Sequence, residues 1–186
     1  MISNKTDREI WLLFKRGDEE TVSFLYGRYF PVLYRYGLKF TPDTSLVEDT
    51  IQDLFAGLIK NHKTVGDTDN ILLYLLVSFR RKLFREQEYA NRYDFAEEMG
   101  NDYPFEIVWS VEQDIIRDEE SQQQSALLLK ALGELTARQK EAIYLRFTKE
   151  LDYAAIAEIM QISIEACRNL ISKAVAGLRK ELCKKV

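Results

Sequence analysis

Apolar residues in the first ninety positions of the chain recur with the period of an α-helix. They lie three, four or seven residues apart within each segment, as in the series Ile10, Leu13, Phe14, Val22, Leu25 and Tyr26. This spacing predicts amphipathic helices that each bury one face. Gly17-Asp18, Thr41-Pro42 and the turn-like stretch HKTVGDTD interrupt the pattern. We therefore expect helices over residues 21–40, 45–61 and 70–92, preceded by a shorter one around Ile10.

The helix expected over residues 45–61 has a sharply divided pattern. One stripe is apolar and is expected in the core: Val47, Ile51, Leu54, Phe55, Leu58 and Ile59. An acidic and amide edge lies beside it, formed by Glu48, Asp49, Gln52 and Asp53. From the residues alone this edge has three interpretations, namely a solvated face, a site for a hard cation, and a docking surface for a basic partner.

The C-terminal sixty residues predict a second group of helices. Thr136 is followed three residues later by Gln139, the capping-box pattern that begins a helix. Asp152 can cap a short helix that carries Ile156 and Ile159. The tripeptide QIS then connects it to a longer helix over about 164–182. Two helices joined by so short a turn have the proportions of a helix-turn-helix.

A helical wheel divides the last helix into two faces. The apolar side comprises Cys167, Leu170, Ile171, Ala174, Val175 and Leu178, and the polar side comprises Arg168, Asn169, Ser172 and Lys173. Arginine and asparagine can bond bidentately to guanine and adenine edges, and lysine and serine suit phosphates. The polar side is typical of a recognition helix in a major groove. An ordinary solvated face is the alternative, and the preceding helix and turn favour DNA binding.

Charge is distributed unevenly along the chain, whose net charge is −4. Residues 91–125 hold ten acidic and two basic side chains, whereas residues 126–186 hold seven acidic and eleven basic ones. The acidic stretch is irregular in apolar spacing and contains Gly100, Pro104 and a glutamine run. We therefore predict an all-α protein with a helical domain over residues 1–92, an acidic linker over 93–124 and a helix-turn-helix domain over 125–186. The alternative is that the acidic stretch is an irregular part of one domain.

Composition disfavours several other classes of protein. No apolar run reaches the roughly 18–20 residues of a membrane span, and the N-terminus does not resemble a signal peptide. Cys167 and Cys183 lack CxxC spacing, and with the single His62 they do not make a typical zinc site. No nucleotide-binding or hydrolase motif occurs. We expect a cytoplasmic protein that is not an enzyme, with no cofactor, no metal and no catalytic residue.

Two segments resemble bacterial sigma factors of the extracytoplasmic-function (ECF) type. LGELTARQKEAIYLRF, YAAIAEIM and ISIEACRN resemble region 4, which reads the −35 promoter element. RGDEETVSFLYGRYFPVLYRY, VEDTIQDLFAGLIKN and LLYLLVSFRRKLFRE resemble region 2, which captures the −10 element. The two modules occur in the family's order and cover about three quarters of the chain. In place of the family's Asn and Asp in the last region 2 helix, the chain has Arg81 and Arg85.

The resemblance implies a transcription initiation factor with separate contact surfaces. It would bind core RNA polymerase, recognise both promoter elements and promote promoter melting, and an anti-sigma factor is a further partner that the family suggests. In region 4 the −35 contacts would be Arg168, Asn169, Ser172 and Lys173. In region 2 the −10 contacts would be Arg80, Arg81, Lys82 and Arg85, whose cations suit a phosphate backbone. The clamp helices of the polymerase largest subunit would contact Glu48, Asp49, Gln52, Asp53 and Phe55.

A helix-turn-helix transcriptional regulator with an N-terminal sensor or interaction domain is the alternative function. The C-terminal half alone is compatible with it. The basic helix over residues 70–92 favours the sigma factor, because a ligand-sensing domain does not need such a helix. The two differ in one property: a regulator binds double-stranded DNA alone, whereas a sigma factor typically needs core polymerase first.

Overall fold

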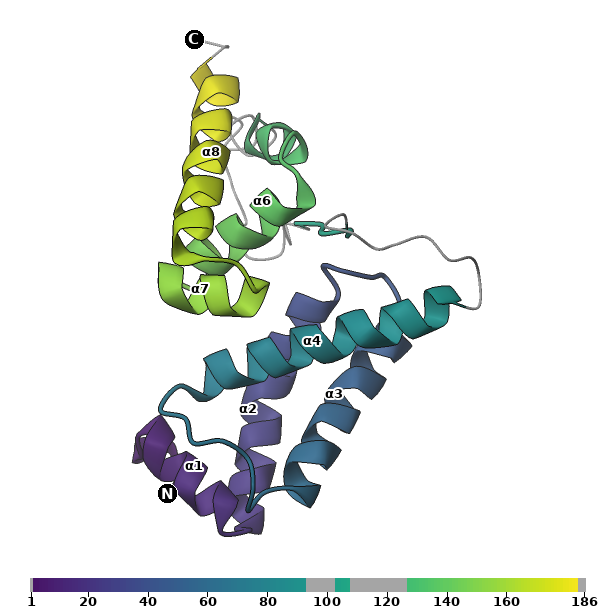
Figure 1. Ribbon diagram of the computed structural model, residues 1–186, viewed down its shortest axis with the longest axis vertical. Coiled ribbons are helices and arrows are strands. Elements are labelled where there is room, and N and C mark those ends of the chain that lie inside the picture. Colours follow the sequence, from purple (N-terminus) through teal and green to yellow (C-terminus); the bar gives the residue numbers. More distant parts are fainter. Residues whose placement is uncertain (1, 93–102, 108–126, 184–186) are drawn as a thin grey trace, which may run out of the picture. The chain divides into compact units, whose positions relative to one another are not determined.

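The computed structural model describes residues 2–92, 103–107 and 127–183 (Figure 1). These residues are helical or irregular and contain no strand, so the predicted all-α fold is confirmed. The chain divides into two compact units, Met1–Met99 and Gly100–Val186. The first contains η1 (Ile2–Asn4), α1 (Asp7–Lys15), α2 (Glu19–Gly37), α3 (Thr44–Lys60) and α4 (Ile71–Arg92). The second contains a helix over 127–133, α6 (Ala137–Ile143), the π-helical turn η3 (Tyr144–Thr148), α7 (Tyr153–Met160) and α8 (Ile164–Cys183).

Short polar side chains begin most of these helices. The side-chain oxygens of Thr6, Asp18, Asp43, Thr136 and Asp152 each accept a hydrogen bond from the backbone amide three residues on. Such caps satisfy amides that have no partner inside the helix. The capping box predicted at Thr136 and the cap predicted at Asp152 are both confirmed. Hydrogen bonds from the Thr21 hydroxyl and amide lower the pKa of Asp18, so this cap is retained unless the pH falls below the usual aspartate range.

The core of the first unit lies where α2, α3 and α4 pack against one another (Figure 1). Phe55, which the sequence placed on the polymerase contact surface, is buried there and makes an edge-to-face contact with Tyr26. The burial of Phe55 does not support a contact with polymerase, because the ring completes the helix interface and is only 4% exposed. Ile59, predicted in the core stripe, is 46% exposed. The stripe therefore turns away from the core near the end of α3.

Helix α1 is attached to the segment that leads into α4. Asp7 accepts a hydrogen bond from the amide of Ile71 at the start of α4, with an N–O distance of 2.9 Å. The buried Trp11 donates from its indole Nε1 to the carbonyl of Gly66 at 2.8 Å. Lys15 forms an ion pair with Asp67. These contacts between residues far apart in sequence hold α1 against the loop between α3 and α4.

Residues 103–107 lie within the stretch predicted as a linker, and they pack on the second unit. The hydroxyl of Tyr103 donates to the carboxylate of Glu141, which is fully buried in α6. Phe105 is buried with its ring centroid 5.9 Å from that of Tyr144. The C-terminal unit therefore includes a segment that precedes its predicted first residue. The rest of the 93–124 linker prediction lies outside the described residues.

Gly37 allows the close approach of three helices in the first unit. A Cβ atom at this position would lie 2.7 Å from Val47 Cγ1 and 2.9 Å from Phe79 Cζ, which are too close for two carbon atoms. We expect Gly37→Ala to lower the free energy of unfolding by roughly 1–3 kcal/mol through overpacking. Chemical denaturation measures this. Gly57→Ala is the matched control: its Cβ meets nothing within 4 Å, so a gain of about 0.5–1 kcal/mol is expected. Equal effects of the two changes would contradict the role of Gly37.

The packing of residues 103–107 gives a second prediction. Phe105→Ala removes a fully buried aromatic side chain and should destabilise the protein by roughly 3 kcal/mol, the lower end of the usual range for such a truncation. Pro104→Ala, at the exposed neighbouring position, should have an effect within about 0.5 kcal/mol. Denaturant midpoints compare the two variants. A Phe105→Ala protein as stable as the control would show that the segment does not pack on α6 and η3.

Candidate nucleic-acid interface

Helices α7 and α8 form a helix-turn-helix in the second unit. Gln161 ends α7 in the left-handed conformation, with φ of 56°, and the amide of Ile162 returns to the carbonyl of Ala157 at 3.0 Å. The hydroxyl of Ser163 then accepts from the amide of Ala166 at 3.0 Å, as a cap for α8. The reversal therefore takes three residues, and the predicted motif is confirmed.

The polar side of α8 is exposed as the helical wheel predicts. Cys167, Ile171 and Ala174 are buried, and α8 contacts both α6 and α7. The side chains expected to contact the −35 element all lie on the exposed side: Arg168, Asn169, Ser172 and Lys173. The structure thus brings these four residues together on one helix face. Their contacts with DNA remain a prediction.

An arrangement at the start of α7 has no counterpart in the sequence analysis. The half-buried ring of Tyr153 has the guanidinium carbon of Arg146 5.1 Å from its centroid and that of Arg168 at 5.8 Å. Arg146 also donates from Nη1 to the carbonyl of Leu151 at 2.8 Å. Burial raises the pKa of the Cys167 thiol, and the positive charge of Arg146 acts in the opposite direction. Helical periodicity gave no signal for this cluster, because its residues come from three different elements.

The basic side of α4 is only partly available to a ligand. Arg81 and Arg85 are exposed, as the prediction requires. Arg80 is 8% exposed and its guanidinium carbon lies 4.5 Å from the ring centroid of Phe84. The burial of Arg80 does not support its predicted role as a phosphate contact, because its charge lies against the aromatic face of Phe84.

Lys82 links α4 to the acidic edge of α3. Its ammonium lies 3.1 Å from a carboxylate oxygen of Asp53 and 3.9 Å from one of Glu86. The lysine side chain is 19% exposed, whereas the Asp53 side chain is 67% exposed. A residue predicted to bind DNA is thus paired with a residue predicted to bind polymerase.

The rest of the acidic edge of α3 faces solvent. Asp49 and Gln52 are exposed, as is Asp53, and Glu48 is half-buried. These four side chains form the acidic edge as the wheel predicted, now without Phe55. Exposed carboxylates beside one another can form charge-assisted hydrogen bonds with arginine or lysine.

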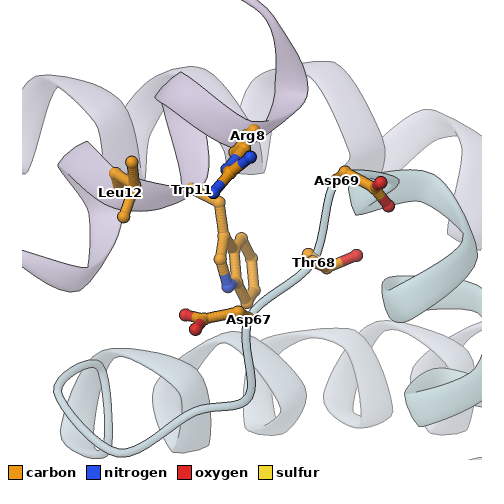
Figure 2. A pocket seen from close by; sticks show the side chains of 6 residues that line it. All are labelled: Arg8, Trp11, Leu12, Asp67, Thr68 and Asp69. Carbon is orange, nitrogen blue, oxygen red and sulfur yellow. The ribbon is translucent and has the colours of Figure 1, made fainter.

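A pocket of about 340 Å³ lies between α1 and the loop before α4. Figure 2 shows the Trp11 indole between α1 and the loop residues Asp67 and Thr68. The complete lining is Arg8, Trp11, Leu12, Asp67, Thr68 and Asp69. The Lys15 ammonium, which donates to the Asp67 carboxylate, lowers the pKa of Asp67. The lining contains one arginine and two aspartates, so its charges favour neither an anionic nor a cationic ligand.

The described part of the chain holds neither a cluster of metal ligands nor a membrane-spanning helix. Within it, no three His, Cys, Asp or Glu side chains gather closely enough to hold a metal ion. None of the helices described is both long and apolar enough to cross a membrane.

The C-terminal unit matches a known family. Residues 125–178 match the family model described as Sigma-70, region 4. The matched range includes α6, α7 and most of α8, and therefore the whole helix-turn-helix. Residues 125–178 of the second unit are thus similar to region 4 of the sigma-70 family.

The chain as a whole shares its fold with solved structures. CnrH, solved in complex with the cytosolic domain of CnrY, has a TM-score of 0.60 at 18% identity, with 98% of this chain and 100% of that one covered. The sigma factor RpoE from Bartonella quintana, solved in complex with the anti-sigma factor NepR, has a TM-score of 0.60 at 18% identity, with 88% and 98% covered. The resemblance found in the sequence is confirmed. The region 4 match covers the helix-turn-helix, and the solved structures show that the whole chain has the same fold as CnrH and RpoE.

The turn of the helix-turn-helix gives a stability prediction. Gln161 is exposed and has a left-handed backbone conformation. This conformation is sterically unfavourable for a residue with a Cβ atom but not for glycine. Gln161→Gly should therefore raise the free energy of unfolding by about 1 kcal/mol. Glu158→Gly, an exposed site inside α7, should lower it by about 1 kcal/mol. If denaturation curves show that both variants have a lower free energy of unfolding, the left-handed conformation of Gln161 is contradicted.

Proposed function

We propose that this protein is an ECF-type sigma factor that acts in the cytoplasm without enzymatic activity of its own. It binds core RNA polymerase, recognises the −35 and −10 promoter elements and promotes melting of the promoter. The observation that carries the proposal is the exposed polar side of α8, because it belongs to a helix-turn-helix within the region 4 match. The proposed domains are a region 2-like domain over 1–92, an acidic linker over 93–124 and a region 4 domain over 125–186.

Helix α8 is the proposed reader of the −35 element. Its buried side packs against α6 and α7, which leaves the opposite side exposed. The major groove of B-DNA is wide enough to admit an α-helix. Arg168 and Asn169 can bond to base edges, while Ser172 and Lys173 suit phosphates.

Helix α4 is the proposed contact for the −10 element. Arg81 and Arg85 lie four residues apart on the exposed side of the helix, where they can neutralise successive phosphates and release counterions. Lys82 would join them when its pairing with Asp53 is given up. Binding energy from the extruded bases would offset the unstacking cost of a few kcal/mol per step.

The acidic edge of α3 is the proposed handle for core polymerase. Glu48, Asp49, Gln52 and Asp53 would meet basic side chains on the clamp helices of the polymerase largest subunit. Charge complementarity of this kind raises the association rate and fixes the register of the complex. An anti-sigma factor is a further proposed partner, because RpoE was solved bound to one, NepR.

A regulator with an N-terminal interaction domain is the competing function, and one experiment separates the two. The full chain is titrated onto duplex DNA with and without bacterial core RNA polymerase. A sigma factor should bind a promoter-containing duplex tightly only with core polymerase present. Equal affinity in its absence would favour the regulator.

The acidic edge gives a prediction for the polymerase contact. Asp49→Lys combined with Asp53→Lys should weaken binding to core polymerase at least a hundredfold, because attraction to a basic surface becomes repulsion at two positions. Both positions are exposed, so the helices should still form. Pull-down and fluorescence anisotropy with labelled protein measure the change.

The matched control reverses two exposed acids elsewhere. Asp69→Lys combined with Glu134→Lys changes the net charge by the same amount and leaves α3 unchanged. It should bind core polymerase within about threefold of the unaltered protein. If both double variants lose binding equally, net charge rather than the α3 edge is responsible.

A further inference from the structure

We propose that Tyr153 is a positioning residue for DNA recognition, which acts by holding the guanidinium of Arg168 against its ring. This inference rests on the proposed role of α8 in reading DNA. Tyr153 belongs to α7 and lies outside the predicted contact set, so it would affect specificity through another side chain.

The geometry around the ring supports this role. Tyr153 is the first residue of α7, directly after the cap Asp152, whose carboxylate accepts the amide of Ala155 at 2.8 Å. The backbone that carries the ring is therefore fixed. The ring is half-buried, and the guanidinium carbon of Arg168 lies 5.8 Å from its centroid. That distance is within the range of a cation–π contact.

Arg146, a residue of η3, also lies against the ring of Tyr153. Its guanidinium carbon lies 5.1 Å from the centroid of Tyr153, and its Nη1 donates to the carbonyl of Leu151 at 2.8 Å. Leu151 is buried, so this hydrogen bond joins Arg146 to a fixed part of the backbone. Tyr153 is thus held by a well-anchored arginine and in turn contacts an arginine that is exposed.

Contact with a ring prepares Arg168 for DNA. An exposed arginine samples many rotamers, and ordering them on binding reduces affinity. A guanidinium that lies over an aromatic face keeps the N–H groups at its edge free to bond to guanine or phosphate. The strength usual for an exposed cation–π contact corresponds to about a two- to fivefold change in affinity. A lysine at position 168 has no planar group to stack in the same way.

A double-mutant cycle tests the inference on the full chain bound to core polymerase. The probe is the duplex that the unaltered holoenzyme enriches from a pool of random-sequence DNA, and filter binding gives its Kd. We expect Tyr153→Leu to weaken binding two- to fivefold and Tyr153→Phe to leave it unchanged. In a protein that carries Arg168→Ala, the same Tyr153→Leu change should have no further effect.

The other outcomes separate failure of the inference from failure of the proposed function. Suppose that Arg168→Ala weakens binding, but that Tyr153→Leu lowers the affinity by the same factor whether position 168 is Arg or Ala. Then Tyr153 does not act through Arg168 and the inference is wrong. The inference is also wrong if Tyr153→Leu has no effect in either background. If Arg168→Ala binds as tightly as the unaltered protein, the proposed role of α8 fails as well.

A second variant guards against loss of folding. Tyr153→Gln removes the aromatic face with a different side chain, and circular dichroism checks that each variant keeps its helices. When both proteins are folded, the two replacements should weaken binding by the same factor and should both have no further effect in the Arg168→Ala protein. A loss of affinity for Tyr153→Leu that Tyr153→Gln does not reproduce would overturn the inference, because the missing ring would not be its cause.

Discussion

The burial of Cys167, Ile171 and Ala174 against α6 and α7 fixes the rotation of α8 about its own axis, and the proposed reading of DNA depends on that rotation. Once this apolar side is inside, Arg168, Asn169, Ser172 and Lys173 lie on the exposed side of α8, where Arg168 also contacts the ring of Tyr153. Helices α6 and α7 each begin after a short polar cap, Thr136 and Asp152 respectively. The residues 103–107 add a buried tyrosine and phenylalanine to the same unit. The proposed recognition surface is thus a consequence of how the small core packs.

In the first unit the corresponding constraint is the close packing of α2, α3 and α4 around Gly37. This packing brings the acidic edge of α3 beside the basic side of α4, and the ion pair between Asp53 and Lys82 is the result. Because the Asp53 side of this pair is exposed to solvent, the pair contributes little to stability, usually no more than about 1 kcal/mol. Its interest lies in its position, because the proposed polymerase surface and the proposed −10 surface share it. A basic partner that takes up Asp53 would leave Lys82 with fewer neutralising neighbours.

Local patterns predicted the local features of this chain well. The all-α fold, the caps at Thr136 and Asp152, and the two sides of α8 follow from spacing and side-chain chemistry within a few residues. The positions that differed depend on contacts that the spacing of apolar residues does not show. Phe55 lies inside against Tyr26 of α2, and Arg80 is buried with its guanidinium over the ring of Phe84, one turn along α4. Ile59 is 46% exposed near the end of α3. Tyr153 and residues 103–107 escaped prediction for the same reason: their partners are distant in sequence or belong to other elements.

Promoter-directed initiation by this chain is measured most directly in a reconstituted transcription reaction. Core RNA polymerase is incubated with fragmented genomic DNA of the source organism, with and without the protein, and the 5′ ends of the transcripts are mapped. A sigma factor should create a set of new 5′ ends that appear only when the protein is present. Two sequence elements at a fixed spacing should precede these ends. The absence of any new 5′ end, while the protein still binds the polymerase, would contradict the proposed function.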